Sequence, residues 1–140
     1  MTKLEDIVNC IKERNLDKAL KLCDLIENNL NKHIIHNFKG VIHLLKNNLD
    51  LAETNFLDSI KLNEKYEDPI KNLYSVYLRK NKHTDLLIYA KKLIEIDKLN
   101  PQYNYQLAYS LDLNNESNDA IKYYEIYINN NGKDKKKALN

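Results

Sequence analysis

The chain has 140 residues, with only two glycines, two prolines and no tryptophan. This length suits one domain, and the scarcity of turn-forming residues favours an all-helical protein over a sheet protein. The formal net charge is +2, but four lysines and one aspartate lie in the tail (Lys133, Lys135, Lys136, Lys137 and Asp134), so the rest is nearly neutral. A neutral body argues against a nucleic-acid surface, which needs a basic field.

The start of the chain, Met-Thr-Lys-Leu-Glu-Asp, has acidic residues where a signal peptide needs an apolar core. No run approaches the roughly 18 apolar residues of a membrane span. We therefore expect no membrane segment and a cytoplasmic location.

The first predicted hairpin joins a helix over residues 3–13 to a helix over residues 17–29. Cys10 and Cys23 fall in facing core positions, and we expect two buried thiols rather than a disulfide. The apolar residues that predict the two helices are Leu4, Ile7, Val8 and Ile11 in the first, and Ala19, Leu22, Cys23 and Ile26 in the second.

The second and third predicted hairpins span residues 33–63 and 67–97. Gly40 is expected where the two helices of the second hairpin approach most closely, with Ala52 opposite, because glycine has no side chain to hold them apart. In the third hairpin Tyr74 and Leu86 occupy the equivalent positions. Either its helices stand further apart, or the Tyr74 ring tilts out toward a groove.

The fourth predicted hairpin spans residues 101–131. Pro101 opens its first helix, Asn114-Asn115 ends that helix, and Ser117-Asn118-Asp119 supplies N-cap chemistry for the second. The second helix, 118–130, is apolar almost all round and lacks an evident cap. Three explanations stay open: a dimer contact, a partner's docking site, or a longer chain whose next repeat begins at Lys135.

Landmarks in the last three hairpins recur with one constant period of about 34 residues, which is typical of helical repeat proteins. Four independent series share this period, and the first hairpin follows with a spacing that is one residue shorter. The series are Gly40, Tyr74 and Ala108; Asn47, Asn81 and Asn115; Ala52, Leu86 and Ala120; and Ile60, Ile94 and Ile128.

On these residues the chain resembles the tetratricopeptide repeat (TPR) family over about residues 3–134. The residues that carry the resemblance include Phe38-Lys39-Gly40…Ala52…Phe56, Leu73-Tyr74…Tyr77…Leu86…Ala90, Leu107-Ala108…Leu111…Ala120…Tyr124 and Ala19…Cys23. The resemblance implies a single domain: an all-α, right-handed α-solenoid of about four helix-turn-helix repeats. The repeats would span residues 1–32, 33–66, 67–100 and 101–134, with 135–140 a short cap or the start of a further repeat.

Such a solenoid presents the first helix of each hairpin on a concave face, where we predict that a protein or peptide segment binds. The predicted inner face is apolar in its first half and polar, with two tyrosines, in its second. The predicted partner-binding residues are Asn37, Val41, Leu44, Lys71, Ser75, Arg79, Gln102, Tyr105 and Tyr109. The same projection adds Leu4, Val8, Ile11, Ile34, Leu78 and Asp112.

No catalytic motif accompanies this pattern, and we expect a non-enzyme without a cofactor or metal. His33, His36 and His43 lack further ligands at a familiar metal-binding spacing, and the chain has no phosphate-binding loop or nucleophile elbow. The leading hypothesis is therefore an interaction scaffold.

Three alternatives compete with this hypothesis, and self-association is a further prediction. The chain could be the N-terminal module of a larger glycosyltransferase-, sulfotransferase- or methyltransferase-like enzyme. RNA binding of the pentatricopeptide kind is disfavoured by Val8, Ile34 and Val41. A chaperone-type carboxylate clamp is disfavoured because Leu4 and Val8 fall where relatives have Lys and Asn, and only Asn72 matches. A homodimer through the apolar terminal helices is also predicted.

Overall fold

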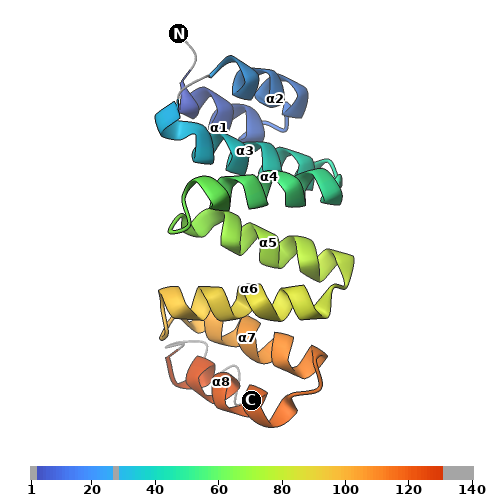
Figure 1. The fold of residues 1–140 in the computed structure, drawn as a ribbon, viewed down its shortest axis with the longest axis vertical. Helices are drawn as coiled ribbons and strands as arrows, with labels where there is room; N and C mark the ends of the chain where they lie inside the picture. Colours follow the sequence, from blue (N-terminus) through green and yellow to red (C-terminus); the bar gives the residue numbers. More distant parts are fainter. Residues whose placement is uncertain (1–2, 27–28, 131–140) are drawn as a thin grey trace. The chain divides into compact units, whose positions relative to one another are not determined.

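The computed structural model describes residues 3–26 and 29–130, which form eight α-helices, one short 3-10 helix and no strand (Figure 1). Each predicted hairpin is present as a pair of consecutive helices, and both turn chemistry and burial repeat along the chain. The elements are α1 (Leu4–Lys12), α2 (Leu16–Leu25), η1 (Asn29–Asn31), α3 (Lys32–Leu45), α4 (Leu49–Leu62), α5 (Glu67–Lys80), α6 (His83–Ile96), α7 (Pro101–Leu113) and α8 (Ser117–Asn130).

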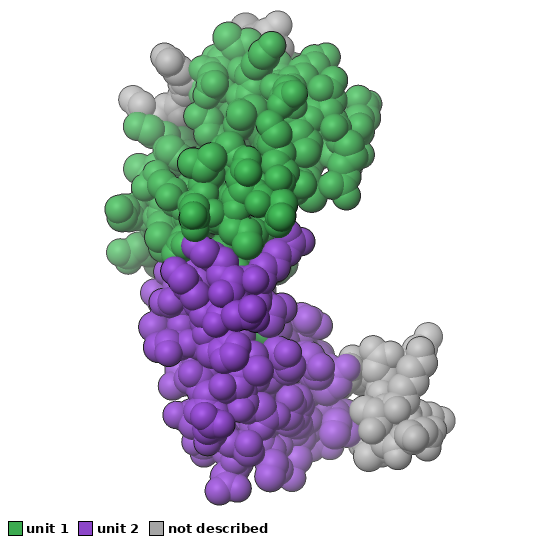
Figure 2. Space-filling model, turned by 90° about the vertical axis from the view of Figure 1, so that its right-hand side faces the viewer, with its two compact units in different colours: residues 1–76 green, residues 77–140 purple. Residues whose placement is uncertain are grey.

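The helices group into two compact units, residues 1–76 (unit 1) and 77–140 (unit 2), coloured separately in Figure 2. In unit 1, α1 packs against α2, α2 against α3, and α3 against α4. In unit 2, α6 packs against α7, and α7 against α8. The boundary between the units falls inside α5, after Val76.

The same turn closes the first helix of every hairpin. One residue of each turn has a left-handed backbone, with φ of 62° at Arg14, 61° at Asn47, 57° at Asn81 and 62° at Asn115. In each turn the next N–H reaches back to a carbonyl of the preceding helix, as from Asn48 to His43 (2.8 Å) and from Glu116 to Leu111 (2.8 Å). This hydrogen bond defines a Schellman motif, in which asparagine tolerates the left-handed conformation well.

A second repeated turn leads out of α4 and α6. Asn63 and Asp97, which lie one repeat period apart, are both extended C-caps, with φ of −153° and −149°. Each side-chain oxygen accepts a hydrogen bond from a nearby N–H, at 3.1 Å from Lys65 and 3.4 Å from Leu99. Both connections therefore begin with an Asx turn.

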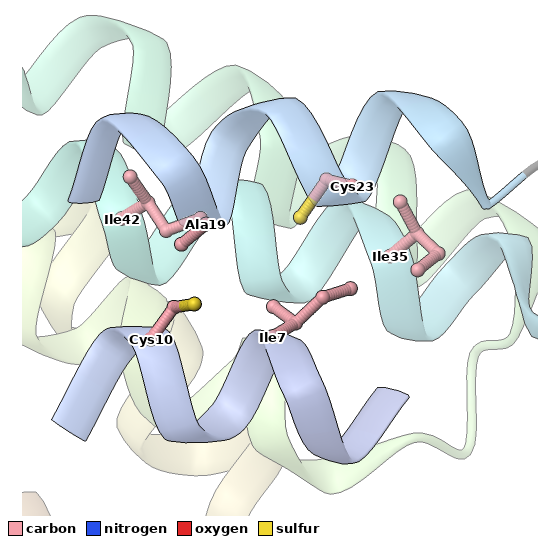
Figure 3. Close-up of a cluster of buried hydrophobic side chains, with 6 residues drawn as sticks. All are labelled: Ile7, Cys10, Ala19, Cys23, Ile35 and Ile42. Carbon is pink, nitrogen blue, oxygen red and sulfur yellow. The ribbon is translucent and has the colours of Figure 1, made fainter. Parts of the chain in front are cut away.

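The core of unit 1 contains a cluster drawn from α1, α2 and α3. Figure 3 shows Ile7 and Cys10 of α1 facing Ala19 and Cys23 of α2. Both cysteines are buried free thiols, as predicted, and burial raises the pKa of Cys23 to about 11. Ile35 and Ile42 of α3 complete the cluster.

In unit 2, polar side chains hold both ends of α7 in place. Asn100 caps the helix by accepting the Tyr103 N–H at 3.1 Å, and Pro101 occupies the first turn, as predicted. At the other end, the Asn114 side chain donates to the His83 carbonyl at 2.8 Å and so ties α7 to the start of α6. Asn104, fully buried, donates to the Lys98 carbonyl at 2.9 Å.

Four details of the sequence-based prediction were wrong. The second helix of the first hairpin ends at Leu25 rather than at residue 29. Ser117 lies inside α8, because the Glu116 carbonyl already accepts the Ala120 N–H at 3.1 Å. The Tyr74 side chain is 4% exposed, so its ring is not turned out into a groove. The residue that faces Gly40 most closely is Phe56 rather than Ala52.

Candidate partner-binding surfaces

Unit 1 contains an open cavity of about 370 Å³ between α1, α3 and α5. The first helices of successive hairpins therefore supply its walls, as expected of an inner repeat face. Its lining residues are Val8, Ile11, Lys12, Asn37, Phe38, Val41, Asp68, Lys71 and Asn72.

The cavity combines an apolar wall with a polar edge. Val8, Ile11 and Val41 are half-buried and present aliphatic surface. On the polar side, the Asn72 amide donates to the Asn37 side-chain oxygen at 3.1 Å. Asn37 is only 4% exposed, so this hydrogen bond satisfies a group that would otherwise be costly to bury.

Tyr66 contacts the polar side of the cavity but does not line it. Its hydroxyl forms hydrogen bonds with Asp68 and Asn37, and its ring meets the His33 ring edge-on at 5.1 Å between centroids. Burial, followed by the negative charge of Asp68, raises the pKa of Tyr66 to about 12. The hydroxyl thus stays protonated at neutral pH and helps to hold Asn37 in place.

Three of the predicted partner-binding residues, Asn37, Val41 and Lys71, line the cavity together. Val8 and Ile11, which the same projection placed on the inner face, line it with them. Leu44 and Ser75 are half-buried in unit 1 outside the lining. The projection missed four lining residues, Lys12, Phe38, Asp68 and Asn72, and of these Asn72 already stood out in the carboxylate-clamp comparison.

The remaining predicted residues lie in unit 2. Arg79, at the end of α5, and Gln102, in the first turn of α7, are exposed. Tyr105 and Tyr109 are 42% and 37% exposed, and their rings are almost parallel, with centroids 6.5 Å apart and planes inclined by 8°. These two side chains provide most of the aromatic surface on the exposed side of α7.

Tyr105 also joins α7 to α8. Its ring centroid lies 5.8 Å from that of Tyr124 and 5.2 Å from that of Tyr127. The Tyr124 hydroxyl donates a hydrogen bond to Asp112, and burial together with this carboxylate raises the pKa of Tyr124 to about 12. We call Tyr105, Tyr109, Tyr124 and Tyr127 the tyrosine cluster.

A second cavity in unit 2, of about 380 Å³, was not predicted from the sequence. It lies between α6, α7 and α8 and has an apolar floor with charged residues of both signs at its edge. Its lining residues are Lys91, Ile94, Glu95, Leu107, Leu111, Glu116, Asp119, Lys122 and Tyr123.

The histidines considered as metal ligands occupy separate environments. His33 packs on Tyr66, and His36 Nδ1 lies 3.5 Å from Asn55 Oδ1. His43 Nδ1 is buried without a hydrogen-bond partner, and its pKa is lowered by burial and by Lys46 and Lys39. Within residues 3–26 and 29–130, no group of three or more potential ligands could hold a metal ion.

The fold is that of a TPR-like helical repeat protein, as the constant repeat period predicted. A solved crystal structure of MamA superimposes with a TM-score of 0.81 and 16% sequence identity, covering 98% of this chain and 79% of that one. A second MamA crystal structure gives 0.79 and 16%, covering 95% and 73%. The MamA RS-1 ArsTM double mutant gives 0.79 and 14%, covering 89% and 71%.

At these identities the similarity establishes the fold alone. No protein-family model matches the chain, and neither does any curated protein. In the part of the chain that the structure describes, no helix is both long and apolar enough to cross a membrane.

Proposed function

We propose that this protein is an interaction scaffold and that the unit 1 cavity binds apolar side chains of a partner protein segment. The observation that carries the proposal is the gathering of Val8, Ile11 and Val41, predicted from helix periodicity, around one open cavity. A concave apolar site with a few polar groups is the usual form of a binding site for a small ligand or peptide side chain.

The chemistry of the lining favours binding over catalysis. It offers two amides, two ammonium groups and one carboxylate, but no histidine, cysteine or serine. Asn37 and Asn72 lie at one edge, where amides suit the backbone or polar side chains of an extended or amphipathic segment. We therefore propose a non-enzymatic role, and the lining gives no reason to invoke a cofactor.

The enzyme-module alternative depends on how the sequence continues from residues 135–140, which lie outside the described residues. A cytoplasmic location and a homodimer through the terminal helices likewise stay predictions. Sedimentation velocity at micromolar concentrations measures self-association directly, and a monomer throughout would contradict the dimer.

The scaffold proposal can be tested with a phage-displayed library of dodecapeptides selected on the purified full chain. We expect enriched peptides to share apolar residues. Val41→Asp should weaken their binding by about tenfold or more, because it places a charge on the apolar wall. The affinity of each synthetic peptide is measured by isothermal titration calorimetry.

Leu51→Asp is the matched control, because Leu51 is an apolar residue of unit 1 that is 50% exposed and lies outside the cavity. Lys71→Glu provides a second cavity variant at an exposed position, where a change of charge leaves the core intact. Circular dichroism verifies the fold of each variant. Equal affinities of wild type, Val41→Asp and Lys71→Glu would refute the proposed site.

A further inference from the structure

Two members of the tyrosine cluster occupy positions that are buried in the preceding hairpin. Tyr124 and Tyr127 of α8 correspond, one repeat period earlier, to Ala90 and Leu93 of α6, which are fully buried. Helix α6 packs against α7. Tyr124 and Tyr127 are only half-buried, and the ring of Tyr105 in α7 contacts both of their rings.

The two helices that carry the cluster have an acidic charge balance. Between Pro101 and Asn130 the chain carries four carboxylates and one ammonium group. One of the carboxylates, Asp112, is exposed and accepts a hydrogen bond from Tyr124. A negative group thus lies directly beside the exposed aromatic rings.

Two other tyrosines of unit 2, Tyr89 and Tyr123, each have a lysine ammonium group over the ring. Lys92 Nζ lies 5.4 Å from the Tyr89 ring centroid, and Lys122 Nζ lies 5.3 Å from that of Tyr123. Among the residues that the structure describes, no lysine or arginine takes such a position over any ring of the tyrosine cluster. Tyr105 and Tyr109 thus keep 42% and 37% of their surface exposed, with no cation from the described residues over either ring.

We propose that the tyrosine cluster and Asp112 bind an arginine side chain of a partner protein segment. The nearly parallel rings of Tyr105 and Tyr109 let a flat guanidinium adopt the same orientation toward both. Arginine suits this surface better than lysine, because its planar group stacks on aromatic rings and also donates hydrogen bonds to a carboxylate. The inference rests on the proposed scaffold function and specifies the chemistry of its partner.

The test uses the full chain and an acetylated, amidated nonapeptide with arginine at alternate positions and glycine or serine between them. A second peptide replaces each arginine by citrulline, which keeps the shape but removes the charge. We expect the citrulline peptide to bind about five- to tenfold more weakly by calorimetry. The arginine peptide should shift the NMR signals of the Tyr105 and Tyr109 rings.

Variants separate the aromatic face from simple charge attraction. Tyr109→Leu and Asp112→Asn should each weaken binding of the arginine peptide by about threefold or more, whereas Tyr109→Phe should retain it because the ring remains. Tyr123→Leu is the matched control, since Tyr123 lies outside the cluster and its ring is already paired with Lys122. Thermal melts followed by circular dichroism verify that each variant is folded.

Several outcomes would overturn the inference. Equal affinity for the arginine and citrulline peptides would do so, as would full binding by a folded Tyr109→Leu variant. If replacing Lys133, Lys135, Lys136 and Lys137 by glutamine shifts the cluster's ring signals without peptide, the occupant is the chain's own tail. The scaffold proposal is judged separately, by library peptides and Val41→Asp, so the two can fail independently.

Discussion

Gly40 shows how a single residue sets the packing of a hairpin. A Cβ atom built on Gly40 would lie 2.8 Å from Cζ of Phe56 and closer still to two other ring atoms. Phe56 is fully buried, so its ring has little room to move. The equivalent positions of the third and fourth hairpins also combine a small and a large residue. The pairs of positions hold Gly40 and Phe56, Tyr74 and Ala90, and Ala108 and Tyr124.

We predict that Gly40→Leu lowers the free energy of unfolding by up to about 2 kcal/mol. Overpacking destabilises a protein by about 1–3 kcal/mol. The higher helix propensity of leucine offsets only about 1 kcal/mol of this loss. A thermal melt followed by circular dichroism measures the change. Adding Phe56→Ala should recover part of the loss, as expected for coupled neighbours; additive effects of the two substitutions would show that they do not share space.

At the residue level, the sequence predicted the cavity only in part. Helix periodicity identified Val8, Ile11, Asn37, Val41 and Lys71, because these residues repeat on one side of the first helices. It missed Phe38, which shares its side chain between the core and the cavity. It also could not place Tyr105 against α8, because a side chain that bridges two helices depends on its rotamer and not on spacing.

At the level of elements, the turns within the hairpins are more uniform than the helices that they join. Asn47, Asn81 and Asn115 all adopt the left-handed conformation, but the first hairpin has Arg14 at this position with φ of 62°. A long side chain without a local hydrogen-bonding amide is less tolerant of this region than asparagine. Of the four turns, the first therefore has the most strained backbone.

We predict that Arg14→Gly stabilises the protein by about 0.5–1 kcal/mol. A residue with a Cβ atom is destabilised by about 1–2 kcal/mol in the left-handed region, and glycine avoids this clash. Part of the gain is lost because glycine makes the unfolded chain more flexible. Urea denaturation measures the change. Glu13→Gly is the control, because Glu13 has a right-handed backbone with φ of −80°, and it should destabilise; stabilisation by both would contradict the explanation.

Helix boundaries were predicted best where capping chemistry marks them. Pro101 and Asn115 fixed the ends of α7 because proline and asparagine have strong positional preferences. The end of α2 was missed, since apolar spacing alone continues through Ile26 while the helix stops at Leu25. The Asn100 cap of α7 was also overlooked, although asparagine before proline at a helix start is a recognisable signal.

At the scale of the whole molecule, hairpins with the same repeated structure present different surfaces. The first hairpins supply an apolar cavity with an amide edge, whereas the last hairpin supplies tyrosines beside carboxylates. The repeat period could be predicted because turns and core positions are constrained in each hairpin. The surfaces could be predicted only as a tendency, because exposed positions are free to vary between repeats.

In helical repeat proteins each repeat contacts mainly its neighbours, so a local defect should have a graded effect along the chain. We predict that Gly40→Ala lowers hydrogen-exchange protection most in α3 and α4 and least in α7 and α8. Ala108→Val, a comparable overpacking at the equivalent position of α7, should reverse this order. Amide exchange followed by NMR reports each helix separately. Uniform loss of protection in both variants would instead mean that the entire chain unfolds as one cooperative unit, which is the behaviour expected of a single domain without repeat-level independence.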